Sequence, residues 1–400
     1  MKHLWLLFFL TLTATACGVV MPITPSPVPQ ATQTVTATLT VTPSVTPTVT
    51  ETPTPTVTLT PTRDYPAAGY GPSGFPNDVN PLTGLKVSNP ALLERRPMIV
   101  KVANLPRNYR PQWGLSLADH VYEYYIEEGT TRFAAVFLGQ DASMVGPIRS
   151  GRLFDHHLIT MYKANFAFGS ADARVRALLF NQRYANRLVI ESACPPMCRY
   201  EPNGVNYLMT NTADLTTYIN NLRLREGNGR QSLDGLAFNY DLPVTGQPAR
   251  VLFVRYSAAI YNRWDYDPTT GKYYRYSDTQ NDLRQGLDEF YAQLTDRLTG
   301  QPIAADNVVV LYVSHRYFSR QPEIIDILLS GPDKAYLFRD GQMFELKWYR
   351  NALDQLFILV GPDGKTFPLK PGNTWFEVVG TTSTLTSGDG ESWRFTFFIP

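Results

Sequence analysis

The chain has 400 residues, enough for two or three domains, because one core is usually complete within about 100–200 residues. Hydrophobic residues make up 44% of it and the formal net charge is +1. This composition excludes a largely disordered protein and provides no overall field that attracts nucleic acid or an acidic membrane. Three cysteines are too few for a small disulfide-based fold.

Residues 1–16 are predicted to form a signal peptide. Lys2 precedes an apolar run over residues 4–12, far shorter than the roughly 20 residues of a membrane-spanning helix. Cys17 directly follows Ala16, as in a bacterial lipobox, so we expect Cys17 to become the lipidated first residue of the mature protein. An ordinary secretory cleavage site that happens to precede a cysteine is the alternative. Both interpretations place the protein outside the cytoplasm. In the first, its N-terminal lipid anchors the chain to the cell membrane.

Residues 17–79 are predicted to be the lipidated cysteine followed by a disordered stalk. Within residues 24–62 there are 16 threonines and eight prolines, and Glu51 is the sole charged residue. Proline favours extended polyproline II, and this composition cannot bury enough apolar surface to fold. At about 3.1 Å per residue, this stretch reaches up to roughly 120 Å. We therefore expect a spacer, and no chemistry within it.

Residues 80–235 are predicted to form an α/β domain. The pattern indicates a first strand, then a β-hairpin, then three helices with one strand between the first two. Ser150 is the expected N-cap of the first helix, and Gly169-Ser170 open the second. The expected strands are 98–103, 121–126, 132–138 and 165–168, and the expected helices are 151–163, 170–181 and 213–224.

Residues 245–380 are predicted to form a smaller, β-rich domain, with residues 381–400 as a C-terminal extension. One helix is expected in it, ending at Gly300, because five apolar residues recur at helical spacing: Leu283, Leu287, Phe290, Leu294 and Leu298. The expected strands are 250–256, 263–266, 272–276, 308–314, 324–329, 335–338, 343–348, 357–360 and 375–379.

The charge differs between the two parts. Residues 94–200 contain 14 basic and nine acidic residues, a balance of +5, whereas residues 201–400 contain 19 basic and 23 acidic, a balance of −4. Solvated surfaces explain such a difference, and opposite signs also favour docking of the two parts.

Several strings in the ordered region resemble those of the YerB-like lipoprotein family. They are Asn80-Pro81-Leu82-Thr83-Gly84, Arg110 to Leu115, Ala118 to Glu123, Glu128 to Phe133, Gly146 to Arg152, Asn307 to Val310, Gly331 through Asp340-Gly341, Trp348 and Pro371 to Trp375. The resemblance covers residues 80–379. It implies an α/β (α+β) layered sandwich in the N-terminal domain, a smaller β-rich C-terminal domain and no established activity. Members tend to carry histidines where this chain has Phe168 and Val205, which argues against a metal or acid–base role there.

An arginine cluster is the first candidate site. Arg132, Arg149 and Arg152 surround two expected helix starts at Ser150 and Ser170. Helix N-termini expose N–H groups, and arginine donates two hydrogen bonds in one plane. Such a group suits a phosphate or a carboxylate. The alternative is that these arginines pair with the acidic residues of the hairpin and first helix, namely Asp119, Glu123, Glu127, Glu128 and Asp155.

Paired carboxylates are the second candidate. Glu123, Glu127 and Glu128 surround one hairpin and Asp155 opens the first helix, so two of them could serve as acid and base in glycoside cleavage. Solvated or salt-bridged acids are the simpler explanation.

The remaining polar residues indicate structural roles. Adjacent His156 and His157 point about 100° apart on a helix and do not readily face one metal. Cys194 and Cys198 favour a local disulfide in an oxidising compartment. Aromatic residues of the second half (Tyr273, Tyr274, Trp348 and Trp375) suit sugar stacking, although core packing is the commoner role. No metal and no cofactor are expected.

The sequence therefore predicts a membrane-anchored lipoprotein that acts as a non-enzymatic binding or scaffold module at the bacterial cell envelope. Its expected partner is an envelope ligand or a cell-wall-associated protein, with contact to the membrane only through the lipid and none with nucleic acid. A cell-wall glycan hydrolase that uses the carboxylates is the alternative.

Overall fold

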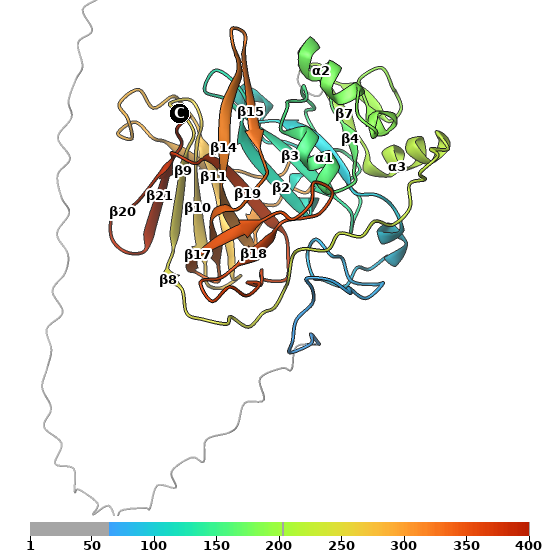
Figure 1. Ribbon diagram of the computed structural model, residues 1–400. Helices are drawn as coiled ribbons and strands as arrows, with labels where there is room; N and C mark the ends of the chain where they lie inside the picture. The colour runs from blue at the N-terminus through green and yellow to red at the C-terminus, as the bar shows by residue number, and fades with distance from the viewer. Residues whose placement is uncertain (1–63, 202–203, 400) are drawn as a thin grey trace, which may run out of the picture. The chain divides into compact units, whose positions relative to one another are not determined.

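The computed structural model describes residues 64–201 and 204–399, which are mostly β-sheet (Figure 1). The predicted signal peptide, Cys17 and the Thr/Pro-rich stretch lie outside these residues. The three α-helices of the described chain all belong to its first half: α1 (Asp155–Met161), α2 (Ala173–Phe180) and α3 (Thr212–Asn221). The second half is β-rich, as predicted. None of the described helices has the length and apolarity needed to cross a membrane.

A 12-stranded sheet forms the centre of the molecule. Its main path runs β18-β17-β16-β14-β19-β2-β3-β1-β4-β5, with β15 paired to β14 and β8 paired to β17. The strands of the first half are β1 (Met98–Ala103), β2 (His120–Tyr125), β3 (Thr131–Phe137), β4 (Asn165–Ala167) and β5 (Leu188–Val189). Those of the second half are β8 (Gln247–Pro248), β14 (Asn307–Arg320), β15 (Glu323–Leu328), β16 (Asp333–Arg339), β17 (Gln342–Tyr349), β18 (Ile358–Val360) and β19 (Thr374–Gly380).

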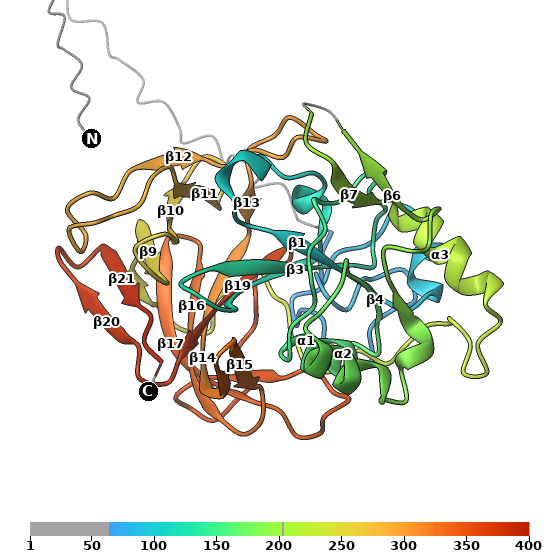
Figure 2. The same ribbon diagram turned by 90° about the horizontal axis from the view of Figure 1, so that it is seen from above.

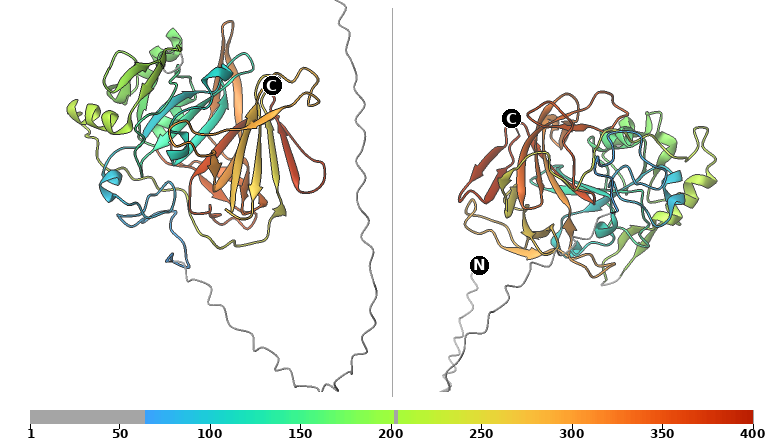
Figure 3. Two further views of the ribbon diagram at one scale, coloured as in Figure 1. Left: turned by 180° about the vertical axis from the view of Figure 1, so that it is seen from behind. Right: turned by 90° about the horizontal axis from the view of Figure 1, so that it is seen from below.

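A seven-stranded sheet packs against it in the order β12-β11-β10-β9-β21-β20, with β13 paired to β11. Its strands are β9 (Val251–Arg255), β10 (Tyr261–Asp267), β11 (Lys272–Asp278), β12 (Tyr291–Gln293), β13 (Ala304–Ala305), β20 (Thr384–Ser387) and β21 (Ser392–Thr396). A small separate ribbon pairs β6 (Met197–Tyr200) with β7 (Tyr207–Thr210). Figures 2 and 3 show the second sheet on the side of the molecule away from the helices.

The two halves of the chain share the central sheet. Strand β19 lies parallel between β14 and β2, with Trp375 opposite Val121. Residues 64–201 and 204–399 accordingly belong to one compact unit. Strand order here is set by long-range pairing, which local sequence patterns do not encode.

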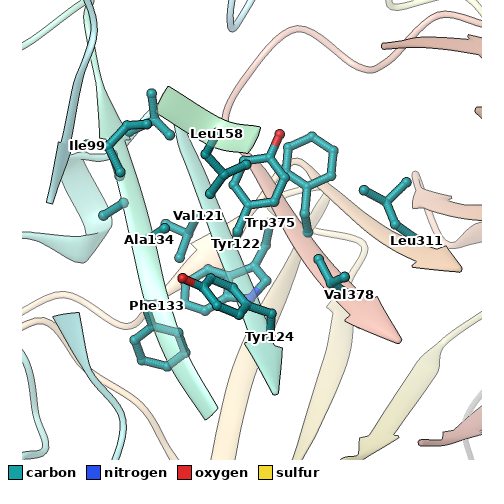
Figure 4. Packing of buried hydrophobic residues seen from close by; sticks show 14 of the residues in the cluster. Ile99, Val121, Tyr122, Tyr124, Phe133, Ala134, Leu158, Leu311, Trp375 and Val378 are labelled. Carbon is teal, nitrogen blue, oxygen red and sulfur yellow. The ribbon is translucent and has the colours of Figure 1, made fainter. Parts of the chain in front are cut away.

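Alternate residues of β2 face different layers. The rings of Tyr122 and Tyr124 pack against Phe154, at the start of α1. The opposite face of the sheet carries Phe133 and Trp375, and Trp375 meets Trp264 of the second sheet with ring centroids 5.2 Å apart. Figure 4 shows this packing around the centre of the sheet. The period of two therefore gives the central sheet a helix-facing side and a sheet-facing side.

The prediction of a helix over residues 283–298 is wrong. Residues 279–290 form a loop and residues 291–293 form β12, which pairs with β11. The buried Asp282 accepts hydrogen bonds from the backbone N–H groups of Arg284, Gly286 and Asp288. These bonds fold the chain into turns before a helix can propagate, so Leu283 and Leu287 point outward at 79% and 75% exposure.

Both ends of the described chain are more integrated than the sequence indicated. Residues 64–79, expected as the end of the stalk, pack on residues 236–240: the backbone of Tyr70 pairs with that of Phe238, and the Tyr65 ring lies against Tyr240. At the other end, the residues expected as an extension form β20 and β21. Strand β21 pairs in parallel with β9, and its Phe395 is fully buried.

Candidate functional site

The segment before α1 is extended and crosses three neighbours by single β-bridges. Val145 bridges to Thr210, Gly146 to Trp113 and Ile148 to Val102. Helix α1 begins only at Asp155, and its N-cap is Phe154, so Ser150 is not the N-cap that we expected. Likewise α2 begins at Ala173 and is capped by Asp172, not by Gly169-Ser170. The two predicted helix starts therefore do not form an anion site, because the serines lie in loops ahead of the helices.

Those two loops nevertheless meet. The Ser150 and Ser170 hydroxyl groups lie 3.1 Å apart, and the backbone N–H of Gly151 donates to the carbonyl of Ser170. A pocket of about 80 Å³ opens beside them, lined by Arg149, Ser150, Gly169, Ser170, Asn206 and Tyr207, among others. We call this the Arg149 pocket. The structure thus brings together Arg149, Ser150 and Ser170 of the predicted cluster.

Arg149 supplies the charge of the pocket. Its guanidinium carbon lies 4.4 Å from the centre of the Tyr109 ring, and one of its nitrogens donates to the Tyr109 hydroxyl. No carboxylate lies within ion-pair distance of Arg149 in the described chain. At the other end of the pocket Arg199 pairs with Glu191 at 2.8 Å. The positive charge of Arg149 is therefore oriented by an aromatic ring and is not neutralised by an acid.

Arg132 and Arg152 do not line the pocket. Arg152 forms a two-pronged ion pair with Glu127, and Arg132 lies 3.8 Å from the same carboxylate. Arg132 also donates to the carbonyl of Ser150 at 2.7 Å. Burial, together with the charge of Arg152, lowers the pKa of Arg132 to about 9. These two arginines match the alternative of pairing with the hairpin acid, and they hold Ser150 in place.

The structure also contains a buried lysine that was not predicted from the sequence. Lys101 in the middle of β1 is fully buried, 3.2 Å from Asp155 and with its Nζ 3.8 Å from the centre of the Tyr124 ring. Burial lowers the pKa of Lys101 to about 7, against the opposing effect of Asp155. Asp155 in turn accepts from the Arg152 N–H and the Tyr124 hydroxyl. The sequence signal was a single lysine inside the otherwise apolar stretch 98–103.

A second buried network joins the two sheets. Arg275 of β11 binds Glu123 at 2.6 Å and Glu377 at 2.9 Å, and all three side chains are essentially inaccessible. Glu123 also accepts from Asn104 and Thr131. Neither Arg275 nor Glu377 was identified from the sequence, because their partners lie on distant strands.

The four candidate catalytic acids are not brought together. Glu123 faces the second sheet, whereas Asp155 contacts Tyr124 on the helix-facing side of the same strand. Glu127 is held by Arg152, and Glu128 is exposed in the hairpin turn. Glu123 and Asp155 are therefore buried on opposite faces of β2.

Histidines and cysteines take structural positions. His120 bonds to the Leu82 carbonyl and the Tyr162 hydroxyl, and His156 to the Tyr184 hydroxyl. Cys194 and Cys198 form a disulfide. Within residues 64–201 and 204–399, there is no group of three or more His, Cys, Asp or Glu side chains that could hold a metal ion.

Comparison with known proteins shows the family of this chain. Two family models match it, the "DUF3048" N-terminal domain over residues 82–225 and the "DUF3048" C-terminal domain over residues 252–376, both described as of unknown function. The chain belongs to the YerB-like family. A curated relative, "Putative lipoprotein YerB" of Bacillus subtilis (strain 168), is 29% identical over 322 residues, which cover 78% of this chain and 89% of the relative. The crystal structure of YerB from Bacillus subtilis matches with a TM-score of 0.62 at 27% identity, covering 75% of this chain and 96% of that one.

The two positions at which the resemblance leads us to expect histidines in other members, Phe168 and Val205, adjoin the Arg149 pocket. Phe168 directly precedes Gly169 and Val205 directly precedes Asn206, and both of these neighbours line the pocket. Phe168 is buried and stacks on Phe166. Both positions therefore lie beside this pocket rather than in a distant part of the fold.

Proposed function

We propose that the protein is a membrane-anchored extracytoplasmic lipoprotein and acts as a non-enzymatic binding module at the bacterial cell envelope. The name of the curated relative supports the lipoprotein assignment, and Cys17 after Ala16 supplies the lipidation site. The module recognises an anionic group of a cell-wall ligand or of a partner protein. The Arg149 pocket is its binding site.

One observation carries this proposal: Arg149 lines a small polar pocket without a carboxylate partner in the described chain. A volume of about 80 Å³ suits one phosphate or carboxylate group rather than a whole sugar ring. The hydroxyls of Ser150 and Ser170 add donors at the pocket wall. Since Arg132 fixes the Ser150 carbonyl, the loop is positioned before the ligand arrives, which reduces the entropy lost on binding.

The hydrolase alternative is disfavoured by the placement of its acids. A glycosidic bond must lie between two carboxyl groups that approach it from one cleft, at about 5–10 Å separation. Glu123 and Asp155 are fully buried on opposite faces of β2, so a glycan does not fit between them. Glu127 is neutralised by Arg152.

Titration calorimetry with three probes tests the pocket: inorganic phosphate, glycerol phosphate and acetate. We expect wild type to bind at least one of them and Arg149→Met to bind it at least tenfold more weakly. Arg174→Met, which removes an arginine paired with Asp172 on the surface of α2, serves as the matched control. The phosphate and acetate arms distinguish the two ligand classes. Equal binding by wild type and Arg149→Met, or no binding of any probe, overturns the site.

Metabolic labelling with palmitate tests the anchor separately. We expect label on wild type and none on Cys17→Ala. Persistent labelling of Cys17→Ala overturns the lipidation site without bearing on the pocket.

A further inference from the structure

Four large apolar side chains of the described unit are exposed on two segments that meet at one end of the second sheet. Leu283, Leu287 and Phe290 belong to the loop between β11 and β12, and Phe398 lies beyond β21, with exposures of 79%, 75%, 56% and 50%. Leu287 and Phe398 line a common groove of about 610 Å³. Since the exposure of large apolar side chains to water is unfavourable, several of them at one end of the unit indicate an interaction surface.

The loop is held in this conformation by a buried carboxylate. Asp282 is 1% exposed, forms an ion pair with Arg255 at 2.5 Å and accepts hydrogen bonds from three backbone N–H groups of the loop. Gly286 adopts a positive φ of 103° within the turn. The outward direction of Leu283 and Leu287 is therefore built into the loop and does not arise from a frayed segment.

The charges around these side chains are already paired with one another. Arg284 pairs with Asp288, while Arg255 and Arg394 both pair with Glu289. A charged partner would find no unpaired group of opposite sign among them. An apolar partner can cover the four side chains at a small desolvation cost, because few unpaired charges lose their contact with water.

The chain that precedes the described unit is long enough for the exposed side chains to reach the membrane. Residues 18–62 comprise 45 residues, of which 24–62 are Thr/Pro-rich, and at about 3.1 Å per residue an extended chain of this length reaches about 140 Å. A folded unit of this size is about 50 Å across. The described chain begins at the end of the unit opposite the loop between β11 and β12 (Figures 1 and 3). A tether longer than the unit therefore allows that far end to meet the membrane that holds the anchor.

We propose that Leu283, Leu287, Phe290 and Phe398 form a membrane-docking face, which inserts into the surface of the lipid bilayer that carries the Cys17 anchor. This rests on the lipidation included in the proposed function. Because the anchor keeps the unit within reach of the bilayer, the insertion of a few apolar side chains is sufficient to hold the unit down.

An environment-sensitive fluorophore on the lipidated protein in phospholipid vesicles tests this face. The dye NBD is attached to Leu287→Cys, and in a matched protein to Leu222→Cys, at an exposed leucine at the end of α3, on the side of the molecule away from the second sheet (Figure 2). The described native cysteines are joined in a disulfide. We expect at least a twofold rise in emission, a blue shift and quenching by brominated lipid at position 287, and none of these at position 222.

Vesicle flotation of the same proteins separates this proposal from the anchor. Flotation of wild type and not of Cys17→Ala reports the anchor. If the protein floats and position 287 remains in a watery environment, the docking face is overturned while the anchor stands. A blue shift at both positions indicates non-specific adsorption and also overturns it.

A variant of the face provides the second measurement. Leu283→Ser/Leu287→Ser should abolish brominated-lipid quenching of NBD placed at Phe290→Cys, whereas Leu353→Ser, at an exposed leucine elsewhere, should not. Light scattering on wild type before vesicles are added detects self-association. A dimer that the double variant loses assigns the face to a second copy of the chain and overturns the membrane assignment.

Discussion

Glu123 of β2 and Glu377 of β19 lie directly opposite each other on neighbouring parallel strands, and the Arg275 guanidinium binds both carboxylates from the second sheet. Burial, and then the charge of Glu123, raises the pKa of Glu377 to about 7. The guanidinium also lies 4.6 Å from the centre of the Trp375 ring. One arginine thus compensates two acids from the two halves of the chain and joins the two sheets.

Arg275→Met should lower the free energy of unfolding by about 3–5 kcal/mol, because it leaves two carboxylates buried without a cation. Urea denaturation measures this. Adding Glu123→Gln and Glu377→Gln should recover part of the loss, since the buried charge is then removed. The exposed pair provides the control: Arg316→Met, opposite Asp326, should cost less than about 1 kcal/mol. A similar small cost for Arg275→Met would contradict the assigned role.

Stability should fall as the pH drops from 6.5 to 4, in part because of His120. Burial lowers the pKa of His120 to about 4, so between these pH values the unfolded chain binds a proton that the folded chain does not. The free energy of unfolding of wild type should therefore decrease relative to His120→Gln by about 3 kcal/mol over this window. Urea titrations of both proteins at pH 7 and 4 measure the difference. A difference that is constant with pH would show that His120 does not titrate in this way.

Phe395→Ala should lower the free energy of unfolding by about 3–5 kcal/mol, as expected for a fully buried aromatic side chain. The half-exposed Phe398 three residues later is a matched control, and Phe398→Ala should change stability by less than about 0.5 kcal/mol in the absence of lipid. Thermal or urea unfolding of both variants compares them. Equal small effects would mean that residues 381–400 are dispensable for the second sheet.

Gly372→Ala should lower the free energy of unfolding by about 1–3 kcal/mol. Gly372 has a φ of 144°, and an added Cβ would meet the carboxylate of Asp306 at 2.0 Å. That carboxylate cannot move freely, because it binds Lys272 and the backbone N–H of Asn373. Gly229→Ala, where no atom lies within 4 Å and φ is ordinary, should be within about 0.5 kcal/mol of wild type. Indistinguishable unfolding curves for the two variants would contradict the steric argument.

The sequence by itself determined most of the strands and the pairing of the hairpin. Alternating or continuous apolar runs located β1, β2, β3, β9, β11, β14, β16, β17 and β19, since a buried strand leaves that pattern whatever its neighbours are. The YerB-like strings identified the family for the same reason, because they are local. Arg149, Ser150 and Ser170 were recognised as a group because they lie in two short segments on either side of α1.

Only the tertiary structure decided which of these groups share an environment. The apolar spacing from Leu283 to Leu298 is helical on paper, but Asp282 takes up the backbone N–H groups of the loop and β12 joins a sheet instead. Arg152 and Arg149 are close in sequence, yet only Arg152 meets a carboxylate. Glu123 and Glu377 meet because β19 inserts beside β2. Pairing between distant strands depends on the whole chain, so its consequences for charge and burial are absent from any local pattern.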